Sequence, residues 1–265
     1  IEAVREDGSR ATFTASLVWM CTGYYRYDAG YAPEFPGRER FRGRVVHPQL
    51  WPEDLDYSGQ RVVVIGSGAT AVTLVPAMAG RAAHVTMLQR SPSYVLSRPA
   101  SDKVAAWFRK LLPEQAAYGL ARWKNVALAT ILYQVSRRRP EGMKRFLLKQ
   151  VRRALGPDGV VEPHFVPSYQ PWDQRLCLVP NNDLFKAIRS GKAEVVTDTI
   201  ETFTETGLRL GSGRELAADL VITATGLELL FLGGSELVVD GEPVDLAGRI
   251  SFKGFMLSGV PNCVF

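Results

Sequence analysis

The residues GSGATA, numbers 66 to 71, follow a short apolar run and precede a segment of helical character. Two glycines separated by one residue, with a small residue three positions later, form the pattern G-x-G-x-x-A. The first glycine of this pattern closes a tight turn, and the second lets a diphosphate approach the backbone. The phosphates lie at the N-terminus of the next helix, where free N–H groups attract anions. The pattern predicts a dinucleotide-binding turn, and a tight strand–helix turn without a ligand is the alternative.

The predicted turn has six members. They are Gly66, Ser67, Gly68, Ala69, Thr70 and Ala71.

The end of the following strand distinguishes the two nicotinamide dinucleotides. The run 84–90, HVTMLQR, is a predicted strand that ends in Gln89 and Arg90. NAD sites usually carry a carboxylate here, which binds the ribose 2′-hydroxyl. A guanidinium instead forms paired hydrogen bonds with a phosphate. The two residues therefore favour NADPH, and an ordinary surface arginine at position 90 is the alternative.

These residues need a strand, a helix and a second strand to hold them. The run 61–66, RVVVIG, is continuous, apolar and β-branched, as in a central parallel strand that is buried on both faces. With the glycine turn, a helix and the strand at 84–90, it forms one predicted βαβ unit. SLVWMCTG and DLVITATG (219–226) are predicted as two further buried strands that end in Thr-Gly, and 1–13 as part of a hairpin around Asp-Gly.

The segment 101–155 differs in character, because apolar residues recur at helical spacing. We expect an all-helical insertion whose apolar stripes pack as core. Residues 101–153 hold thirteen Lys or Arg and three acids, so the block carries 13 − 3 = +10, although the whole chain carries +5. Such a block suits an anionic membrane surface or nucleic acid, and equally a solvated helix face. Nucleic acid is not expected, because the interleaved aromatic residues of single-strand binders are missing.

Composition sets further bounds. The 265 residues suffice for one large domain or two modest ones. The three cysteines, Cys21, Cys177 and Cys263, lie far apart without metal spacing, which favours reduced thiols and a cytoplasmic location. No metal site is expected. No apolar run reaches the ~18 residues of a membrane span.

One further stretch is more specific than the glycine turn. FRGRVVHPQLWP places Phe41, Gly43, His47 and Trp51 at fixed spacing just before that turn. It matches the signature F-x-G-x-x-x-H-x-x-x-W-P, so the chain resembles Baeyer–Villiger flavin monooxygenases. The two Thr-Gly strand ends resemble the family as well. SYQPWDQRLCLVPNNDLF (168–185) is most similar to the subgroup of ethionamide-activating monooxygenases.

The resemblance covers the whole chain and implies an α/β fold with two dinucleotide-binding domains, a Rossmann-like NADPH domain inserted in an FAD domain. Residues 1–57 would be a part of the FAD-binding domain together with the linker. The NADPH-binding domain would be 58–220, with the helical insertion at about 100–160, and 221–265 would begin the return to the FAD domain. The signature residues would form a linker that couples the domains, with His47 as a hydrogen-bonding element rather than a base, and Gly43 would permit a backbone shape closed to other residues.

The resemblance also implies the chemistry, in which NADPH reduces FAD and one oxygen atom of O2 enters a ketone or a sulfur compound. Arg175 matches the family's active-site arginine and would stabilise the oxygen anion that develops, because a guanidinium stays protonated. An ion pair with Asp173 is the alternative for Arg175. Gln174 stands where family members often have a lysine for the 2′-phosphate, so Arg90 would carry more of the selectivity.

No second G-x-G-x-x-G precedes the signature. The chain therefore resembles an internal fragment, and we expect it to bind FAD poorly and to be inactive by itself. A non-catalytic NADPH-binding remnant is the second hypothesis. An N-hydroxylating or microsomal-type relative is the third, which Trp51-Pro52 disfavours. The substrate and the oligomeric state stay open.

Overall fold

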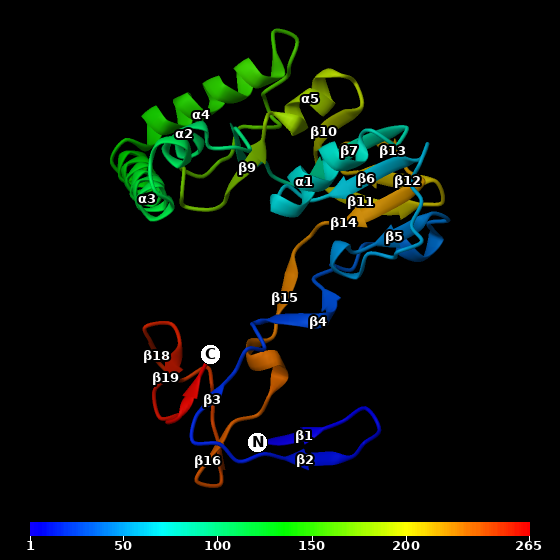
Figure 1. The fold of residues 1–265 in the computed structure, drawn as a ribbon. Helices are drawn as coiled ribbons and strands as arrows, with labels where there is room; N and C mark the ends of the chain where they lie inside the picture. The colour runs from blue at the N-terminus through cyan, green and yellow to red at the C-terminus, as the bar shows by residue number, and fades with distance from the viewer. The chain divides into compact units, whose positions relative to one another are not determined.

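The computed structural model describes all residues from Ile1 to Phe265, and the chain forms two compact units. Unit 1 comprises Ile1–Tyr31 and Leu227–Phe265, and unit 2 comprises Ala32–Gly226 (Figure 1). Residues 32–57, which the sequence assigned to an FAD part and linker, belong to unit 2 because their strand joins its sheet.

A five-stranded parallel sheet forms the centre of unit 2 (Figure 1). Its order is β10 (Ala193–Thr197), β7 (His84–Gln89), β6 (Arg61–Ile65), β14 (Leu220–Thr223) and β5 (Arg44–Val46). Every neighbouring pair is parallel. The runs at 61–66, 84–90 and 219–226 are thereby confirmed as strands, and the apolar, β-branched composition of β6 reflects its central place.

Both faces of this sheet are covered, which explains why its strands lack an alternating polar pattern. Val62 and Val64 of β6 face helices α1 (Ala69–Met78) and α5 (Asp183–Arg189) within one apolar cluster. Val63 and Ile65 face the other side, in a cluster with the antiparallel strands β11 (Ile200–Thr204), β12 (Gly207–Leu210) and β13 (Glu215–Ala217). The result is a layer of helices, a parallel sheet and an antiparallel sheet, an α/β fold as predicted.

The helical insertion consists of α2 (Lys103–Leu111), α3 (Glu114–Arg138) and α4 (Pro140–Leu155). It follows β8 (Tyr94–Arg98), which pairs in parallel with β9 (Leu176–Pro180). Helix α4 packs on β8 through Met143 and Leu147. In Figure 1 the three helices gather beside β9, at the side of unit 2 away from β5.

The expectation that all apolar stripes of this insertion form core is wrong for two of the three helices. Met143, Leu147, Val151 and Leu155 of α4 are buried. Helix α2 buries no residue, and α3 buries only Ala117 and Ser136. The reason is that α2 and α3 contact each other, whereas only α3 meets α4 and neither reaches the parallel sheet. None of the helices combines the length and the apolar character needed to cross a membrane.

Unit 1 is built from short strand pairs. β1 (Glu2–Val4) and β2 (Arg10–Thr12) form the predicted hairpin, and Gly8 in its turn has φ +79°. The other pairs are β3 (Val18–Trp19) with β20 (Cys263–Val264), β4 (Tyr25–Gly30) with β15 (Leu227–Leu229), β16 (Val238–Val239) with β17 (Glu242–Pro243), and β18 (Ser251–Phe252) with β19 (Met256–Leu257). SLVWMCTG is not a buried strand, because β3 has a single neighbour and leaves Trp19 74% exposed.

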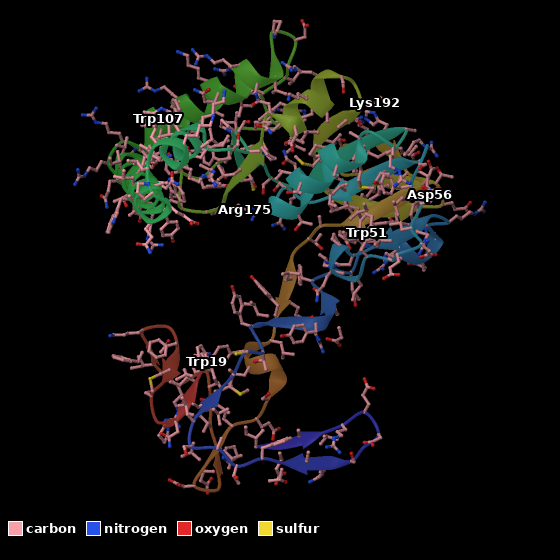
Figure 2. The ribbon with its side chains drawn as sticks, in the orientation of Figure 1. Trp19, Trp51, Asp56, Trp107, Arg175 and Lys192 are labelled. Carbon is pink, nitrogen blue, oxygen red and sulfur yellow. The ribbon has the colours of Figure 1, made fainter.

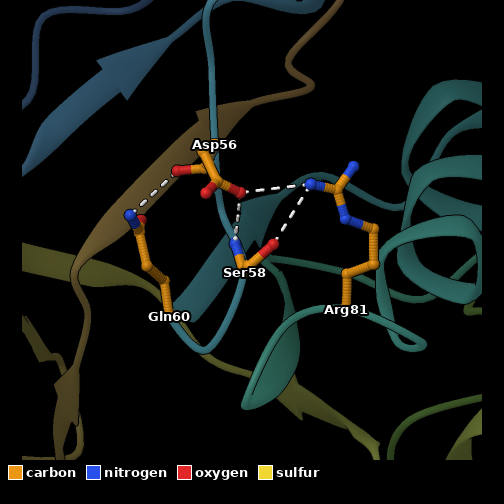
Figure 3. A network of polar contacts seen from close by, with 4 residues as sticks. All are labelled: Asp56, Ser58, Gln60 and Arg81. Atoms are coloured by element: carbon orange, nitrogen blue, oxygen red, sulfur yellow. Dashed lines mark hydrogen bonds and ion pairs between the residues drawn. The ribbon is translucent and has the colours of Figure 1, made fainter.

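The amino ends of the parallel strands are held by polar contacts. Asp56 accepts a hydrogen bond from Arg81 (3.1 Å) and one from the backbone N–H of Ser58 (3.0 Å), and Gln60 donates to the Asp56 carbonyl (Figure 3). The Arg81 guanidinium also stacks on Tyr57, 4.9 Å from the ring centre. These contacts fix the segment that leads into β6.

A second polar contact fixes the start of the neighbouring strand β14. Asp219 binds Arg61 with both carboxylate oxygens, at 3.0 Å to Nε and 2.6 Å to Nη2, and also accepts from the Arg61 backbone N–H. This donor set lowers the pKa of Asp219 to about 2. The pair ties the first residue of β6 to the residue before β14.

The Asp219 contact predicts a specific acid sensitivity. Because the folded-state pKa lies below the unfolded value of about 3.9, the contribution is complete above about pH 5 and is lost as the pH falls from there toward 2. Asp219→Asn should remove about 1 kcal/mol of unfolding free energy at pH 7, a value discounted for the exposure of the pair, and less at pH 3.5. Urea unfolding at both pH values measures this.

Asp54→Asn is the control, because Asp54 is 81% exposed and lies 3.8 Å from Arg44. It should change the unfolding free energy little at either pH. An equal loss in the Asp219 variant at pH 7 and pH 3.5 would contradict the proposed linkage.

Candidate functional site

The glycine turn lies at the carboxyl end of β6, between the ends of two neighbouring strands. The Gly66 N–H donates to the carbonyl of Leu88 in β7 (2.8 Å). On the other side, a Cβ at Gly66 would lie 2.4 Å from the Ala224 carbonyl oxygen, just after β14. The φ of Gly66 is +143°. Glycine is therefore required here both by the close backbone approach and by the conformation.

Gly68 has a different role, because the space beside it is open. It is the N-cap of α1 with φ −84°, and a Cβ built there meets no atom within 4 Å. No side chain caps the helix, so the N–H groups of its first turn face outward without a side-chain acceptor. Ala71, the small third residue, is fully buried against the sheet. The turn thus offers free donors and room for an anionic group, which is the arrangement that a diphosphate requires.

Arg175 is held directly beside this turn. Its Nε donates to the Ser93 hydroxyl (3.0 Å) and its Nη2 to the Ser67 hydroxyl (3.2 Å), while the two hydroxyls lie 3.1 Å apart. Ser67 and Ser93 are buried, whereas Arg175 is exposed. The Tyr169 hydroxyl donates to the Arg175 carbonyl (3.0 Å) and fixes the backbone. In Figure 2, Arg175 lies between the helical insertion and α1.

The Arg175–Asp173 ion pair, the alternative raised by the sequence, does not form. Asp173 instead accepts from Arg137 of α3 at 2.5 Å, and no carboxylate lies within 4.0 Å of the Arg175 guanidinium. Its charge is therefore not neutralised by a neighbouring side chain. A fixed cation with neutral partners is available to an anion that enters the turn.

Comparison with known proteins shows what the chain is similar to. The family model described as flavin-binding monooxygenase-like matches residues 3–131. The FAD-containing monooxygenase EthA of Mycolicibacterium smegmatis is 56% identical over 261 residues, which is 98% of this chain and 53% of that protein. The probable FAD-binding monooxygenase AlmA of Acinetobacter baylyi is 52% identical, over 96% of this chain and 51% of that protein. Over nearly its whole length the chain is similar to flavin-binding monooxygenases.

Solved structures support the fold assignment. An open crystal structure of cyclohexanone monooxygenase superimposes with a TM-score of 0.74 at 18% identity, covering 99% of this chain and 59% of that one. A steroid monooxygenase bound to NADP superimposes with a TM-score of 0.61 at 20% identity, covering 84% and 48%. The chain spans about half the length of the curated relatives that it matches.

The two residues that the sequence predicts to select NADPH, Gln89 and Arg90, lie beside the turn. The register pairs Ile65 with Leu88, so Gln89 and Arg90 follow β7 at the edge where Gly66 follows β6. Arg90 is exposed and forms no ion pair within 4.0 Å. Gln89 is buried, and its amide donates to the His164 carbonyl (2.7 Å) and the Thr197 hydroxyl (2.9 Å). Its amide nitrogen is thus used inside the protein. Gln174 is exposed next to Arg175.

The signature residues pack within unit 2. His47 caps the short helix η2 (Pro48–Leu50): its Nδ1 accepts from the Gln49 N–H (3.2 Å), so the proton is on Nε2, which donates to the Gly226 carbonyl (3.0 Å). His47 therefore ties this segment to the chain after β14. Trp51 packs edge-on against Tyr57, and Phe41 packs edge-on against Phe203.

Gly43 is required for a reason other than the expected one. Its φ is not in the left-handed region, so the backbone shape is open to other residues. A Cβ at this position would instead lie 2.3 Å from the Asp219 carbonyl oxygen and 2.5 Å from the Phe41 ring. The close approach of β5 to the segment before β14 excludes a side chain.

Sequence reasoning missed the groups that orient Arg175. Ser93 and Tyr169 stand in loop-like segments without a recognisable motif, and only the fold brings them to Arg175. Cys177 was noted only for its spacing, yet its thiol lies 3.7 Å from the Ser67 carbonyl. Burial raises the pKa of this thiol, with an opposing contribution from Arg175. Cys177 is therefore an uncharged packing residue beneath the turn.

Alanine substitutions of the two glycines of the turn should change the free energy of unfolding by different amounts. Gly66→Ala should lower the free energy of unfolding by roughly 1–3 kcal/mol, because the methyl group meets the Ala224 carbonyl and the φ is strained. Gly68→Ala should change it by less than about 0.5 kcal/mol, since the space is open and the φ is ordinary. Thermal and urea unfolding of both variants measure the difference. Equal losses would show that the turn is not shaped as described.

Proposed function

We propose that this chain provides the NADPH-binding part of an NADPH- and FAD-dependent monooxygenase, which inserts one oxygen atom of O2 into ketones or oxygenates sulfur in thioethers and thioamides. The observation that carries the proposal is the open glycine turn with an unpaired guanidinium, Arg175, held beside it. The names of the relatives, which are FAD-containing or FAD-binding monooxygenases, support it.

The residues of the turn fit NADPH. The N–H groups at the start of α1 would bind the diphosphate, and Gly68 would leave room for it. Arg90 would bind the 2′-phosphate, and Gln89 would position Arg90 by anchoring the end of β7 to Thr197. Gln174, beside Arg175, would be a weaker neutral contact. A neighbouring structure that contains NADP has the same fold.

Arg175 would keep a positive charge close to the reacting end of the nucleotide. Ser67 and Ser93 hold its Nε and Nη2, and the remaining N–H groups stay available to an anionic oxygen. Because both hydroxyls are neutral, the charge of Arg175 is oriented without being neutralised. FAD, when bound, supplies the reduction of O2 with electrons from NADPH. The chain has one strand–glycine turn–helix unit, which we assign to NADPH.

The domain assignment is part of the proposal. We assign 1–57 to an FAD-binding domain and linker, 58–220 to the NADPH-binding domain with its insertion at about 100–160, and 221–265 to the return to the FAD-binding domain. The signature residues Phe41, Gly43, His47 and Trp51 would act in the linker. The bond from His47 to the Gly226 carbonyl supports this, because it joins the two passages of chain at the boundary of unit 2.

A non-catalytic NADPH-binding module is the second candidate. It shares the glycine turn and Arg90 but requires no function of Arg175, so the orientation of Arg175 by Ser67 and Ser93 favours the enzyme. We further propose a cytoplasmic location, supported by three free cysteines, and contact of the basic insertion with a membrane surface.

Nucleotide selectivity tests the NADPH assignment. Wild-type chain should bind NADPH more tightly than NADH in calorimetry. Arg90→Gln should weaken NADPH binding roughly 10- to 100-fold, as expected for lost hydrogen bonds to a charged group, and leave NADH binding unchanged. Arg40→Gln, which removes an exposed arginine of the short helix Arg38–Arg40, is the matched control. Equal dissociation constants for both nucleotides in wild type would contradict the assignment.

The Arg175 assignment predicts a separation of two half-reactions. In the full-length, flavin-loaded enzyme, Arg175→Ala should abolish oxygenation of the substrate and leave NADPH-dependent flavin reduction measurable, because the lost charge would stabilise the oxygen anion. Ser93→Ala should reduce oxygenation less, since Ser67 still holds the guanidinium. Stopped-flow flavin absorbance and product analysis report the two steps. Full oxygenation by Arg175→Ala would exclude the role and favour the non-catalytic module.

A further inference from the structure

Helix α2 carries an apolar stripe that faces away from the protein. Val104, Trp107 and Leu111 recur at spacings of three and four, which places them on one face of the helix. Their exposed fractions are 47%, 57% and 60%. A surface helix normally buries such a stripe against the core, so this face of α2 lacks a partner within the chain. Figure 2 shows Trp107 on the helical insertion, away from the parallel sheet.

Helix α3 repeats this feature over a greater length. Leu120, Trp123, Ala127 and Ile131 follow at spacings of three, four and four, so they form a second stripe along one face. Leu120, Trp123 and Ile131 are 49%, 69% and 60% exposed. The helices α2 and α3 contact each other and form a hairpin. Each arm of the hairpin therefore presents an apolar stripe that includes one exposed tryptophan.

Residues 101–153, which include this hairpin and most of α4, carry much unpaired positive charge. Three of their thirteen cations form ion pairs, Lys124 with Asp102, Arg137 with Asp173, and Arg152 with Glu162. The other ten, 13 − 3, have no carboxylate within 4.0 Å. They are Lys103, Arg109, Lys110, Arg122, Arg138, Arg139, Lys144, Arg145, Lys149 and Arg153.

Exposed apolar stripes bordered by unpaired cations fit one kind of surface. An anionic lipid bilayer offers phosphates to the Lys and Arg side chains and an apolar layer just beneath them. Tryptophan favours that boundary, since its ring is apolar and its N–H is polar. Because no helix is suited to span a membrane, the helices would lie in the interface. We propose that the α2–α3 hairpin docks on an anionic lipid surface, with both stripes inserted among the headgroups.

Long cationic side chains make this docking compatible with the observed charge distribution. Lys103 and Lys110 flank Trp107 on α2, four residues before it and three residues after it. Their aliphatic stems can lie along the apolar layer while the charged ends reach the phosphates. The attraction is electrostatic over a range of about 8 Å at physiological ionic strength, so salt must weaken the docking.

Vesicle sedimentation tests the proposal with the chain as it exists. The chain should partition onto vesicles of phosphatidylcholine with 30% phosphatidylglycerol (about one anionic lipid in three) and not onto pure phosphatidylcholine. Lys103→Glu with Lys110→Glu should reduce the partition coefficient roughly 25-fold or more, at about fivefold for each lost cation. Trp107→Ser with Trp123→Ser should reduce it about tenfold or more through lost insertion.

Two matched variants control for general effects. Trp19→Ser removes an exposed tryptophan of unit 1, and Arg38→Glu with Arg40→Glu reverses two exposed charges of unit 2 outside the insertion. Both should bind vesicles like wild type, and circular dichroism checks that every variant is folded. None of these measurements depends on nucleotide binding or turnover.

Three results would overturn the proposal. The first is equal binding to both vesicle compositions, and the second is unchanged binding of the hairpin variants. The third is a wild-type chain that does not bind anionic vesicles and forms a dimer, which Trp107→Ser with Trp123→Ser converts to monomer. That result would assign the stripes to a protein–protein contact. Blue-shifted tryptophan emission that appears with anionic vesicles and is lost in the double tryptophan variant would support insertion.

Discussion

The close approach of three strand ends around Gly66 is the constraint on which the site depends. The Gly66 N–H binds the Leu88 carbonyl, and the Ala224 carbonyl occupies the place of a side chain. This contact directs the chain from β6 into α1 and leaves Gly68 open at the start of the helix. The free N–H groups of α1 and the end of β7 then lie at one edge of the sheet, where open α/β sheets bind their ligands.

The polar contacts divide the sheet into an edge for stability and an edge for binding. At the amino edge, Asp56 and Asp219 are each paired with an arginine, Arg81 and Arg61, and these pairs fix the entries to β6 and β14. At the carboxyl edge, Arg90 and Arg175 have no carboxylate within 4.0 Å. Cations left unpaired at one edge and paired at the other are what a site for an anionic dinucleotide requires.

The helical insertion contributes to both proposed properties of the chain. Helix α4 buries its apolar face and supports β8. Ser93 and Arg175 directly precede β8 and β9 and meet at the adjoining amino ends of these strands. Arg137 of helix α3 forms an ion pair with Asp173. Asp173 therefore does not pair with Arg175, which bonds to its serine partners instead. The hairpin of α2 and α3 leaves its apolar stripes outside the protein. One insertion thus orients the candidate catalytic arginine and carries the lipid-docking surface.

The sequence alone was sufficient for the βαβ unit, the glycine turn and the resemblance to flavin monooxygenases, because local spacing and β-branched runs report local structure. It did not predict which apolar stripes are buried, since α2, α3 and α4 show the same periodicity and only packing distinguishes them. It also assigned Gly43 to backbone conformation, whereas a carbonyl more than 170 positions away excludes the side chain. The partners of Arg175 and Gln89 were likewise decided by tertiary structure, because hydrogen bonds between residues 75 to 108 positions apart leave no local pattern.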